Sequence, residues 1–286
     1  MGAIVNAALF TGLALTIGAV GVRYLVLTRA GLAVSERAPV ARDVARAGLW
    51  GALVVLVAAP ARALVQAMGL ADAGDPLLPL VRTIVTSTAT GRALMLQAIW
   101  AAAAAMAFSS ARFGRQRGWS AAAMAAVVLA VVPGLTGHAA ASERATLALA
   151  AATVHVLGAG LWIGGLFHLW RIAGPASDAT LAAVLQAFHR VALAGAAMVA
   201  LSGVNHVLMT LDAPGALVAT TWGRVLLAKL ALVAIVLFLG YRHWRGAEAT
   251  VAAGSRAALR VSIGREAIIA LVVLAVTGVL TTLSPE

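Results

Sequence analysis

Cysteine is absent from the 286-residue chain, and charged residues make up only 11% of it. Without a thiol the chain can form no disulfide, no cysteine-based zinc site and no thiolate relay for a soft metal. Any soft-metal chemistry must therefore use methionine and histidine. The sequence also lacks HExxH, GxSxG and P-loop motifs and a carboxylate pair at a common depth, so we expect neither an enzyme nor an ATP-driven process.

Hydrophobic residues, by contrast, make up 62% of the chain, and the mean hydropathy is +0.98. These values indicate an integral membrane protein. The apolar runs reach about 20 residues or more, the length that crosses roughly 30 Å of hydrocarbon as a helix. No long linker divides the chain, so we expect residues 1–286 to form a single membrane domain. We predict an all-α, polytopic membrane helix bundle with eight transmembrane helices at residues 2–27, 45–70, 84–110, 119–138, 145–171, 181–211, 220–244 and 260–283.

The net charge of +11 is distributed unevenly along the chain. Basic residues cluster after the first, third, fifth and seventh predicted helices, whereas the intervening loops carry acidic residues and few arginines. By the positive-inside rule the basic loops are cytoplasmic, which places both termini on the outside. Topology and attraction to anionic lipid account for the charge, so we expect membrane lipids, and no nucleic acid, as partners. The basic set contains Arg29, Arg37, Arg42, Arg46, Arg112, Arg115, Arg117, Arg171, Arg242, Arg245, Arg256 and Arg260, and the acidic set contains Asp72, Asp75, Glu143 and Asp212.

A weak internal similarity links "TGRALMLQ" at 90–97 with "WGRVLLAK" at 222–229. Both place G-R-x-L near the start of a predicted helix, as in a parallel repeat of four plus four helices. Transporters built from such repeats bind their substrate near the repeat interface. The alternative is that G-R-x-L simply recurs in a chain rich in alanine, leucine and arginine, and the sequence leaves both open.

Histidines inside the predicted helices are the first candidates for function, because polar groups at membrane depth are costly. His155 lies near the middle of the bilayer, at a depth of about 15 Å. At 100° per residue Trp162 falls about 20° from His155, and glycines beside it allow a neighbouring helix to approach. His168 falls about 140° away, so we interpret it as an anchor at the membrane interface. We place His189 and His243 at the inner interface as well.

The sixth predicted helix carries a second set of candidates on one stripe. Met198, Ser202, Asn205 and Met209 fall within about 60° of one another, with His206 beside them and Asp212 at the outer mouth. Thioether and imidazole suit Cu(I), and imidazole with carboxylate suits Cu(II). Methionine at helical spacing also simply fills protein cores, which is the alternative for this stripe.

Three further residues, in other predicted helices, complete the set of candidate functional residues. His138 ends the fourth predicted helix near the outer surface, where it could join His155 and His206 in an outward-facing group. Lys229 near mid-bilayer and Glu266 in the last helix are buried charges that need partners. A polar seam between the last two helices would supply them. The alternatives are that an arginine pairs with Glu266 and that Lys229 reaches toward the interface.

Several motifs together resemble the copper resistance D family (CopD/PcoD). They are H-x6-W-x-G-G-L from His155 to Leu166, "SG" at Ser202–Gly203, T-x-W-G-R-x-L-L-x-K-L from Thr220 to Leu230, and Glu266 followed by "VLAVTGVLTTLSP". The ordered match covers residues 138–286, whereas helices of the first half, 1–138, resemble the family mainly in hydropathy. The motif positions of the family point to His155, Trp162, Lys229 and Glu266 as candidate functional residues. His138 also matches a motif position.

The resemblance implies an eight-helix protein of the bacterial inner membrane that moves copper ions, as Cu⁺ or Cu²⁺, toward the cytoplasm. It also implies a small periplasmic copper-binding partner of the CopC type. Two alternatives stay open: a b-type haem protein, with two histidines on facing helices as axial ligands, and a membrane scaffold for copper-enzyme assembly. The sequence does not define the oligomeric state.

Overall fold

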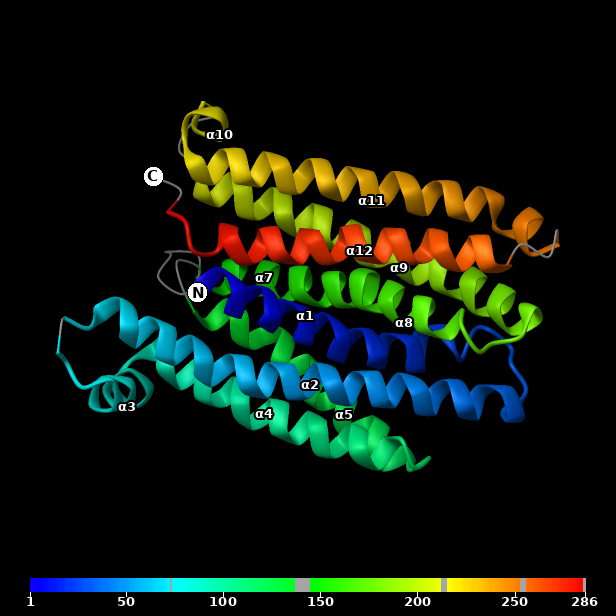
Figure 1. Cartoon of the computed structure of the whole chain (residues 1–286), viewed down its shortest axis with the longest axis horizontal. Helices are drawn as coiled ribbons and strands as arrows, with labels where there is room; N and C mark the ends of the chain where they lie inside the picture. Colours follow the sequence, from blue (N-terminus) through cyan, green and yellow to red (C-terminus); the bar gives the residue numbers. More distant parts are fainter. Residues whose placement is uncertain (73, 137–144, 212–214, 253–255, 285–286) are drawn as a thin grey trace.

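The computed structural model describes residues 1–286 except 73, 137–144, 212–214, 253–255 and 285–286. The described residues form helices and contain no strand, which confirms the all-α prediction (Figure 1). In chain order the helices are α1 (Gly2–Gly21), the π-helical turn η1 (Val22–Val26), α2 (Val34–Leu70), α3 (Leu77–Ser87), α4 (Ala89–Ala111), α5 (Gln116–Val131), the 3₁₀ turn η2 (Val132–Leu135), α7 (Ala145–Ala159), the π-helical turn η3 (Gly160–Gly164), α8 (Gly165–Ile172), α9 (Asp178–Thr210), α10 (Ala216–Ala219), α11 (Thr221–Ala252) and α12 (Arg256–Leu280).

Among the described residues, eight helical segments are long and apolar enough to cross a membrane, as the hydropathy predicts. Two boundaries differ from the predicted ones. α2 begins at Val34 rather than near residue 45, so Pro39 as well as Pro60 lies inside the helix. The predicted helix 84–110 is interrupted at Thr88, whose hydroxyl accepts a hydrogen bond from the Gly91 amide and so begins a new helix.

α1 occupies the middle of the bundle. It packs against α2 and α5 on one side and against α12, η3 and α8 on the other (Figure 1). Its first turns are tied to α12 by a hydrogen bond of 3.0 Å from the Asn6 amide to the Thr281 hydroxyl. Both chain ends lie at the same end of the bundle, which we call the terminal end.

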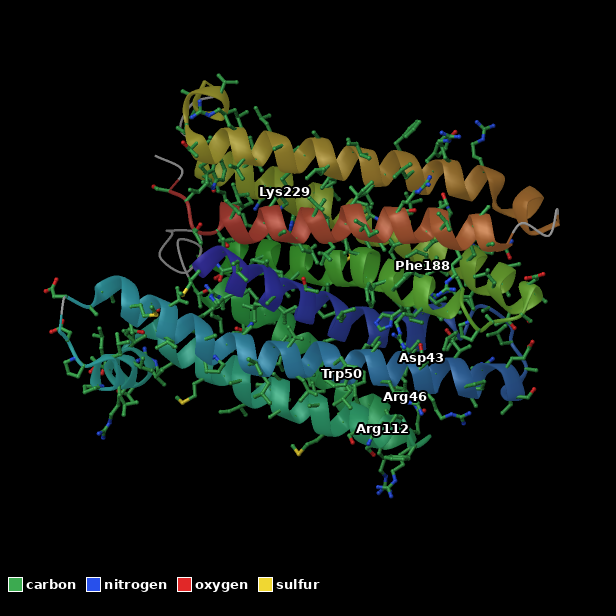
Figure 2. All side chains as sticks on the ribbon, in the orientation of Figure 1. Asp43, Arg46, Trp50, Arg112, Phe188 and Lys229 are labelled. Carbon is green, nitrogen blue, oxygen red and sulfur yellow. The ribbon has the colours of Figure 1, made fainter. Side chains whose placement is uncertain are left out.

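The opposite end of the bundle carries most of the described basic residues, and we call it the basic end. Figure 2 shows Arg46 and Arg112 there, together with Asp43. Arg171 at the end of α8 binds the Asp43 carboxylate of α2 through two of its nitrogens, at 2.6 and 3.2 Å. This ion pair joins the two halves of the chain, since α2 and α8 are far apart in sequence.

The span formed by α7, η3 and α8 is held by close backbone approaches. A Cβ atom on Gly164 would overlap the carbonyl oxygen of Ala14 in α1, and one on Gly158 would lie 2.7 Å from the carbonyl oxygen of Gly195 in α9. Small residues let helices approach in this way in membranes, where packing rather than the hydrophobic effect drives association. Glycines therefore hold this span between α1 and α9.

The structure corrects the interpretation of His168 as an anchor at the membrane interface. Its side chain is only 1% exposed, and Nε2 donates a hydrogen bond of 3.0 Å to the carbonyl oxygen of Leu15 in α1. The π-helical turn η3 inserts an extra residue between His155 and His168, which changes the rotation expected from a regular helix. His168 is therefore a structural contact between α8 and α1.

We predict that Gly164→Ala lowers the free energy of unfolding by about 3 kcal/mol, because the added methyl overlaps backbone that cannot move aside. The matched control is Gly69→Ala in α2, where a Cβ would meet nothing within 4 Å. The control should be neutral or stabilising by up to about 1 kcal/mol. Thermal unfolding of both variants in the same detergent makes the comparison, and equal stabilities would contradict the close approach of η3 to α1.

Candidate functional site: a cavity beside His155

His155 of α7 makes a direct contact with α9. Its Nδ1 lies 3.1 Å from the hydroxyl oxygen of Ser202, and a Cβ on Gly203 would lie 3.7 Å from His155 Cε1. The motif residues His155 and Ser202–Gly203, 47 positions apart in sequence, thus meet in space. The hydrogen-bonding partner that a buried imidazole requires is therefore supplied by α9.

The hydrogen bonds of Ser202 favour one neutral tautomer of His155. The Ser202 hydroxyl lies within hydrogen-bonding distance of two backbone carbonyls of its own helix, at 2.5 Å from Met198 and 3.2 Å from Val199. When its proton is donated to them, the hydroxyl oxygen accepts from His155, and Nδ1 then carries the ring proton. The lone pair on Nε2 is the one left to bind a metal, which is how partners beyond the ligands commonly orient a ligating histidine.

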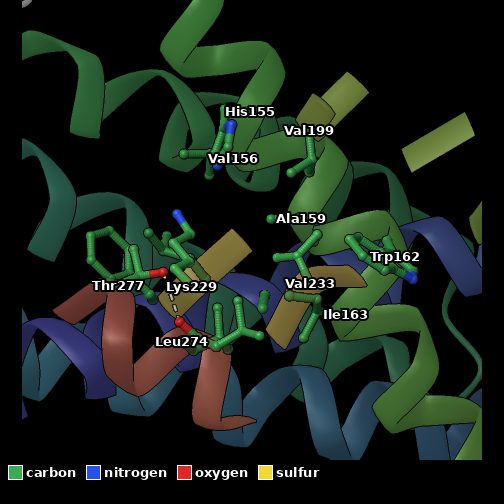
Figure 3. Close-up of a pocket in the computed structure, with 15 residues that line it drawn as sticks. His155, Val156, Ala159, Trp162, Ile163, Val199, Lys229, Val233, Leu274 and Thr277 are labelled. Atoms are coloured by element: carbon green, nitrogen blue, oxygen red, sulfur yellow. Dashed lines mark hydrogen bonds between the residues drawn. The ribbon is translucent and has the colours of Figure 1, made fainter. Parts of the chain in front are cut away.

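A cavity of about 80 Å³ lies beside His155, and we call it the outer cavity. Apolar side chains of α1, α7, η3, α9, α11 and α12 form most of its wall. Besides Trp162, the lining side chains with polar groups are His155, Lys229 and Thr277 (Figure 3). Trp162 lines the same cavity, as expected from its position relative to His155 on the helix.

Lys229 of α11 points into this cavity (Figure 3). No hydrogen bond or ion pair joins it to another described residue. The Thr277 hydroxyl of α12 donates to the carbonyl oxygen of Val273 at 2.8 Å, which leaves its oxygen able to accept a further bond. Lys229 and Thr277 thus line the same cavity, whereas Glu266, the other charged member of the predicted polar seam, lines a different one.

The part of the α9 stripe farther from the terminal end faces α7. Met198 packs against α7, since a Cβ on Gly158 would lie 2.8 Å from Met198 Cβ. Closer to the terminal end, the Asn205 amide nitrogen lies 3.6 Å from the sulfur of Met209, whose side chain is 38% exposed. His206 is exposed. The stripe therefore runs from the exposed end of α9 to the contact with His155.

Other predicted site residues lie elsewhere. Glu266 does not line the outer cavity but a second one nearer the basic end, together with His189, which is half-buried and not only interfacial. His138 and Asp212 lie outside the described residues. Among the residues that the structure describes, no three histidine, aspartate or glutamate side chains gather as a metal site. A copper ion beside His155 would therefore have to bind sulfur or oxygen groups as well.

Sequence reasoning missed the π-helical turn η3 (Gly160–Gly164). Such turns are frequent at functional sites, where the extra residue widens the helix locally. Trp162 belongs to this turn and lines the outer cavity. The cluster of glycines around Trp162 in the sequence was the available signal, but regular helical geometry hides the added residue.

The fold and this cavity define a polytopic helical membrane protein that encloses polar side chains at membrane depth. Comparison with protein families matches residues 2–148 to the N-terminal domain of copper resistance protein D-like proteins and residues 182–280 to copper resistance protein D. The chain belongs to the copper resistance protein D family (CopD), which confirms the resemblance and extends it to the first half. Searches among curated proteins and among solved structures found no match.

Membership supports a role in copper resistance and a membrane location. The family is defined by copper resistance rather than by a class of reaction.

We predict that Ser202→Ala allows both neutral tautomers of His155 to form, because it removes the hydroxyl oxygen that bonds to Nδ1. Imidazole ¹⁵N shifts should then report a mixture of the two tautomers in place of one. Thr153→Ala is the matched control: its hydroxyl also bonds to a backbone carbonyl, of Leu149 on the same helix, but does not touch His155. A single unchanged tautomer in Ser202→Ala would show that another group orients the ring.

Proposed function

We propose that this protein carries copper ions across the bacterial inner membrane from the periplasm toward the cytoplasm, with the outer cavity as a binding point on the way. The observation that carries the proposal is the contact of His155 with Ser202, which presents a metal-competent nitrogen at membrane depth in a copper resistance family. Membrane-embedded polar residues commonly mark ion pathways.

The α9 stripe supplies the approach to His155 in this proposal. Met209, Asn205 and Met198 follow one another from the exposed end of α9 toward the Ser202 contact. Soft thioether ligands favour Cu(I), and the small number of imidazole and carboxylate groups suits an ion that passes rather than one that stays. His206 stands at the exposed end of this stripe. His138 and Asp212 are proposed to join it from the outer loops.

Lys229 limits how long a cation stays in the outer cavity. A protonated amine and a copper ion that share a space of about 80 Å³ repel each other, and we take a separation of about 6 Å to gauge the size of the effect. At an effective dielectric constant of about 20, this separation gives a repulsion of about 3 kcal/mol. Copper therefore binds weakly in the outer cavity while Lys229 is charged. A change in the protonation of Lys229, or a movement of its side chain, can then control the release of the ion.

Because the sequence carries no P-loop, we propose that transport is passive or coupled to an ion gradient. A small periplasmic copper-binding protein of the CopC type is the proposed donor, on the basis of family resemblance. The haem alternative gains no support from His155 and His168, since His155 bonds to α9 and His168 to α1.

We predict that His155→Gln abolishes copper uptake while the protein still inserts and folds. Glutamine can replace the hydrogen bond to Ser202, but it binds Cu(I) poorly. The matched control is His168→Gln, which alters a buried histidine of the same span that contacts backbone instead of the cavity. It should lower thermal stability and leave copper uptake per folded molecule unchanged. Uptake of copper into cells, divided by protein abundance, gives the comparison.

The same assay separates the stripe from simple packing. Met209→Leu combined with His206→Ala should reduce uptake, because it removes a thioether and an imidazole from the exposed end of α9. Unchanged uptake in this double variant would make the stripe a packing feature. Unchanged uptake in His155→Gln would show that His155, the central residue of the proposal, is not needed as a copper ligand.

The proposed orientation can be tested separately. Eight spans place both termini on one side, and the basic loops assign that side to the periplasm. A periplasm-active reporter fused after Glu286 should be active, and one fused after Gly114, between α4 and α5, should be inactive. The reverse pattern would contradict the orientation and, with it, the direction of transport.

A further inference from the structure

A second cavity, of about 360 Å³, lies nearer the basic end, and we call it the inner cavity. Its wall is formed mainly by α9 and α11 and is completed by residues of η3, α8 and α12. Phe188 of α9 is among the lining residues (Figure 2). The inner cavity is far larger than the outer cavity of about 80 Å³, and most of its lining side chains are apolar.

The inner cavity is long and runs toward the membrane boundary at the basic end. On α9 its lining residues extend from Ala196 to Ala182, a rise of about 21 Å along the helix axis. Half the thickness of the hydrocarbon core of a bilayer is only about 15 Å. On α11 the lining ends at Tyr241, one residue before Arg242, where the apolar span of that helix ends. The inner cavity therefore reaches from the interior of the membrane to its boundary.

Two exposed leucines show that the inner cavity is open sideways, toward the bilayer. Leu193 of α9 and Leu237 of α11 both line the cavity, yet their side chains are 63% and 43% exposed. Both residues belong to membrane-spanning segments, so the medium that they meet is hydrocarbon rather than water. A hydrocarbon chain can therefore enter between α9 and α11 without crossing a polar barrier.

Polar lining residues gather toward the basic end of the inner cavity. Gln186 and His189 of α9 and Tyr241 of α11 lie closer to that end than the exposed leucines do, whereas Ala196 and Val236 line the deep end. The wall thus changes from apolar to polar in the order in which a phospholipid changes from acyl chain to head group. Tyrosine is itself common at the level of the head groups.

Glu266 also lines the inner cavity, as a buried carboxylate. Glu266 and His189 each interact with another group of the protein already. Their presence therefore does not identify a cation as the occupant of the cavity. The features that distinguish the cavity are its length, its apolar wall and its opening toward lipid.

Arginines stand at the polar end of the inner cavity, on the two helices that border its opening. Arg245 donates a hydrogen bond of 3.2 Å to the Tyr241 hydroxyl, which holds the guanidinium beside a residue of the cavity wall. Arg190 follows His189 on α9 and is exposed, as Arg245 is. A guanidinium binds phosphate oxygens through parallel hydrogen bonds. Basic groups between helices at a membrane boundary are typical sites for anionic lipid head groups.

We propose that the inner cavity holds one acyl chain of an anionic phospholipid, whose phosphate binds Arg190 and Arg245. The chain enters between Leu193 and Leu237 and lies along α9 toward the deep end of the cavity. A long, apolar and laterally open space suits a flexible hydrocarbon chain, whereas a single ion needs ligands close around it. The lipid site is independent of the proposed transport of copper, because none of its polar residues lines the outer cavity.

Native mass spectrometry of the purified full chain tests the head-group contacts, with phosphatidylglycerol and phosphatidylcholine of identical acyl chains as probes. The wild type should bind one phosphatidylglycerol about tenfold more tightly than phosphatidylcholine. Arg190→Gln combined with Arg245→Gln should remove this preference. The matched control is Arg115→Gln combined with Arg117→Gln, which removes two exposed arginines at the start of α5 and should keep it.

The variant Ala192→Phe tests the position of the acyl chain, since Ala192 is half-buried and lines the inner cavity. The added ring should occupy the space of the chain and weaken the binding of phosphatidylglycerol about tenfold. Ala194→Phe is the matched control, because Ala194 is exposed on the same helix and is not among the lining residues. It should bind the lipid as the wild type does.

A photoactivatable phosphatidylglycerol with a diazirine in its acyl chain tests the wild type directly, whether or not Ala192→Phe folds. In nanodiscs it should crosslink to Ala192 and Gly240, which are half-buried in the cavity wall. Replacing the surrounding phosphatidylcholine by unlabelled phosphatidylglycerol, at a constant amount of probe, should suppress these crosslinks. Crosslinks to exposed Ala194 and Phe238 should persist, because bulk lipid reaches both residues.

Several results would overturn the proposal. Equal binding of the two lipids by the wild type, or an unchanged preference in the double arginine variant, would mean that the arginines do not hold the head group. Unchanged binding in Ala192→Phe, or crosslinks confined to exposed residues, would mean that the lipid lies on the surface and not in the cavity. A dimer without bound phospholipid would mean that a second copy of the chain covers the opening.

Discussion

The close backbone approach of the span α7–η3–α8 to α1 and α9 is the constraint on which the rest of the structure depends. In a bilayer, helices gain little from burying apolar surface, so they associate where their surfaces fit. Gly164 admits the carbonyl of Ala14, and Gly158 admits that of Gly195. These two contacts fix the rotation of the span. They place His155 against Ser202 of α9 and His168 against the carbonyl of Leu15 in α1.

The same constraint explains why a cavity survives beside His155. Glycine contacts draw the span toward α1 and α9, whereas α11 packs mainly against α12. The bundle is therefore tight around α1 and less complete where α11 faces η3. Side chains of moderate size such as Val233 and Thr277 line the space that remains. Close packing of the span against α1 and α9 thus leaves room for polar side chains on the side that faces α11.

Hydropathy was sufficient to predict eight spans, because the cost of unsatisfied backbone in lipid makes apolar helices the only simple solution. The contact of His155 with Ser202–Gly203 was only implied by their joint occurrence in family motifs. Local chemistry escaped prediction: Thr88 interrupts a continuous apolar run by capping a new helix. His168 was misread because its place beside Trp170 and Arg171 at the end of the span does not reveal that α1 covers its side chain. Contacts between distant helices, such as Glu266 with Gly240, have no signal in a single sequence.

The two buried ionisable groups of the last spans have opposite charge and lie at different depths. Lys229 lines the outer cavity and Glu266 the second cavity nearer the basic end, and a rise of about 16 Å along α11 separates Lys229 from Gly240, which lies against Glu266. A cation in the first cavity is repelled by the charged amine, and a cation in the second is attracted by the carboxylate. Because little water screens either group, this difference acts over the whole distance. For the proposed copper cargo, this difference in charge favours the terminal-to-basic direction, which is the direction of the proposed import.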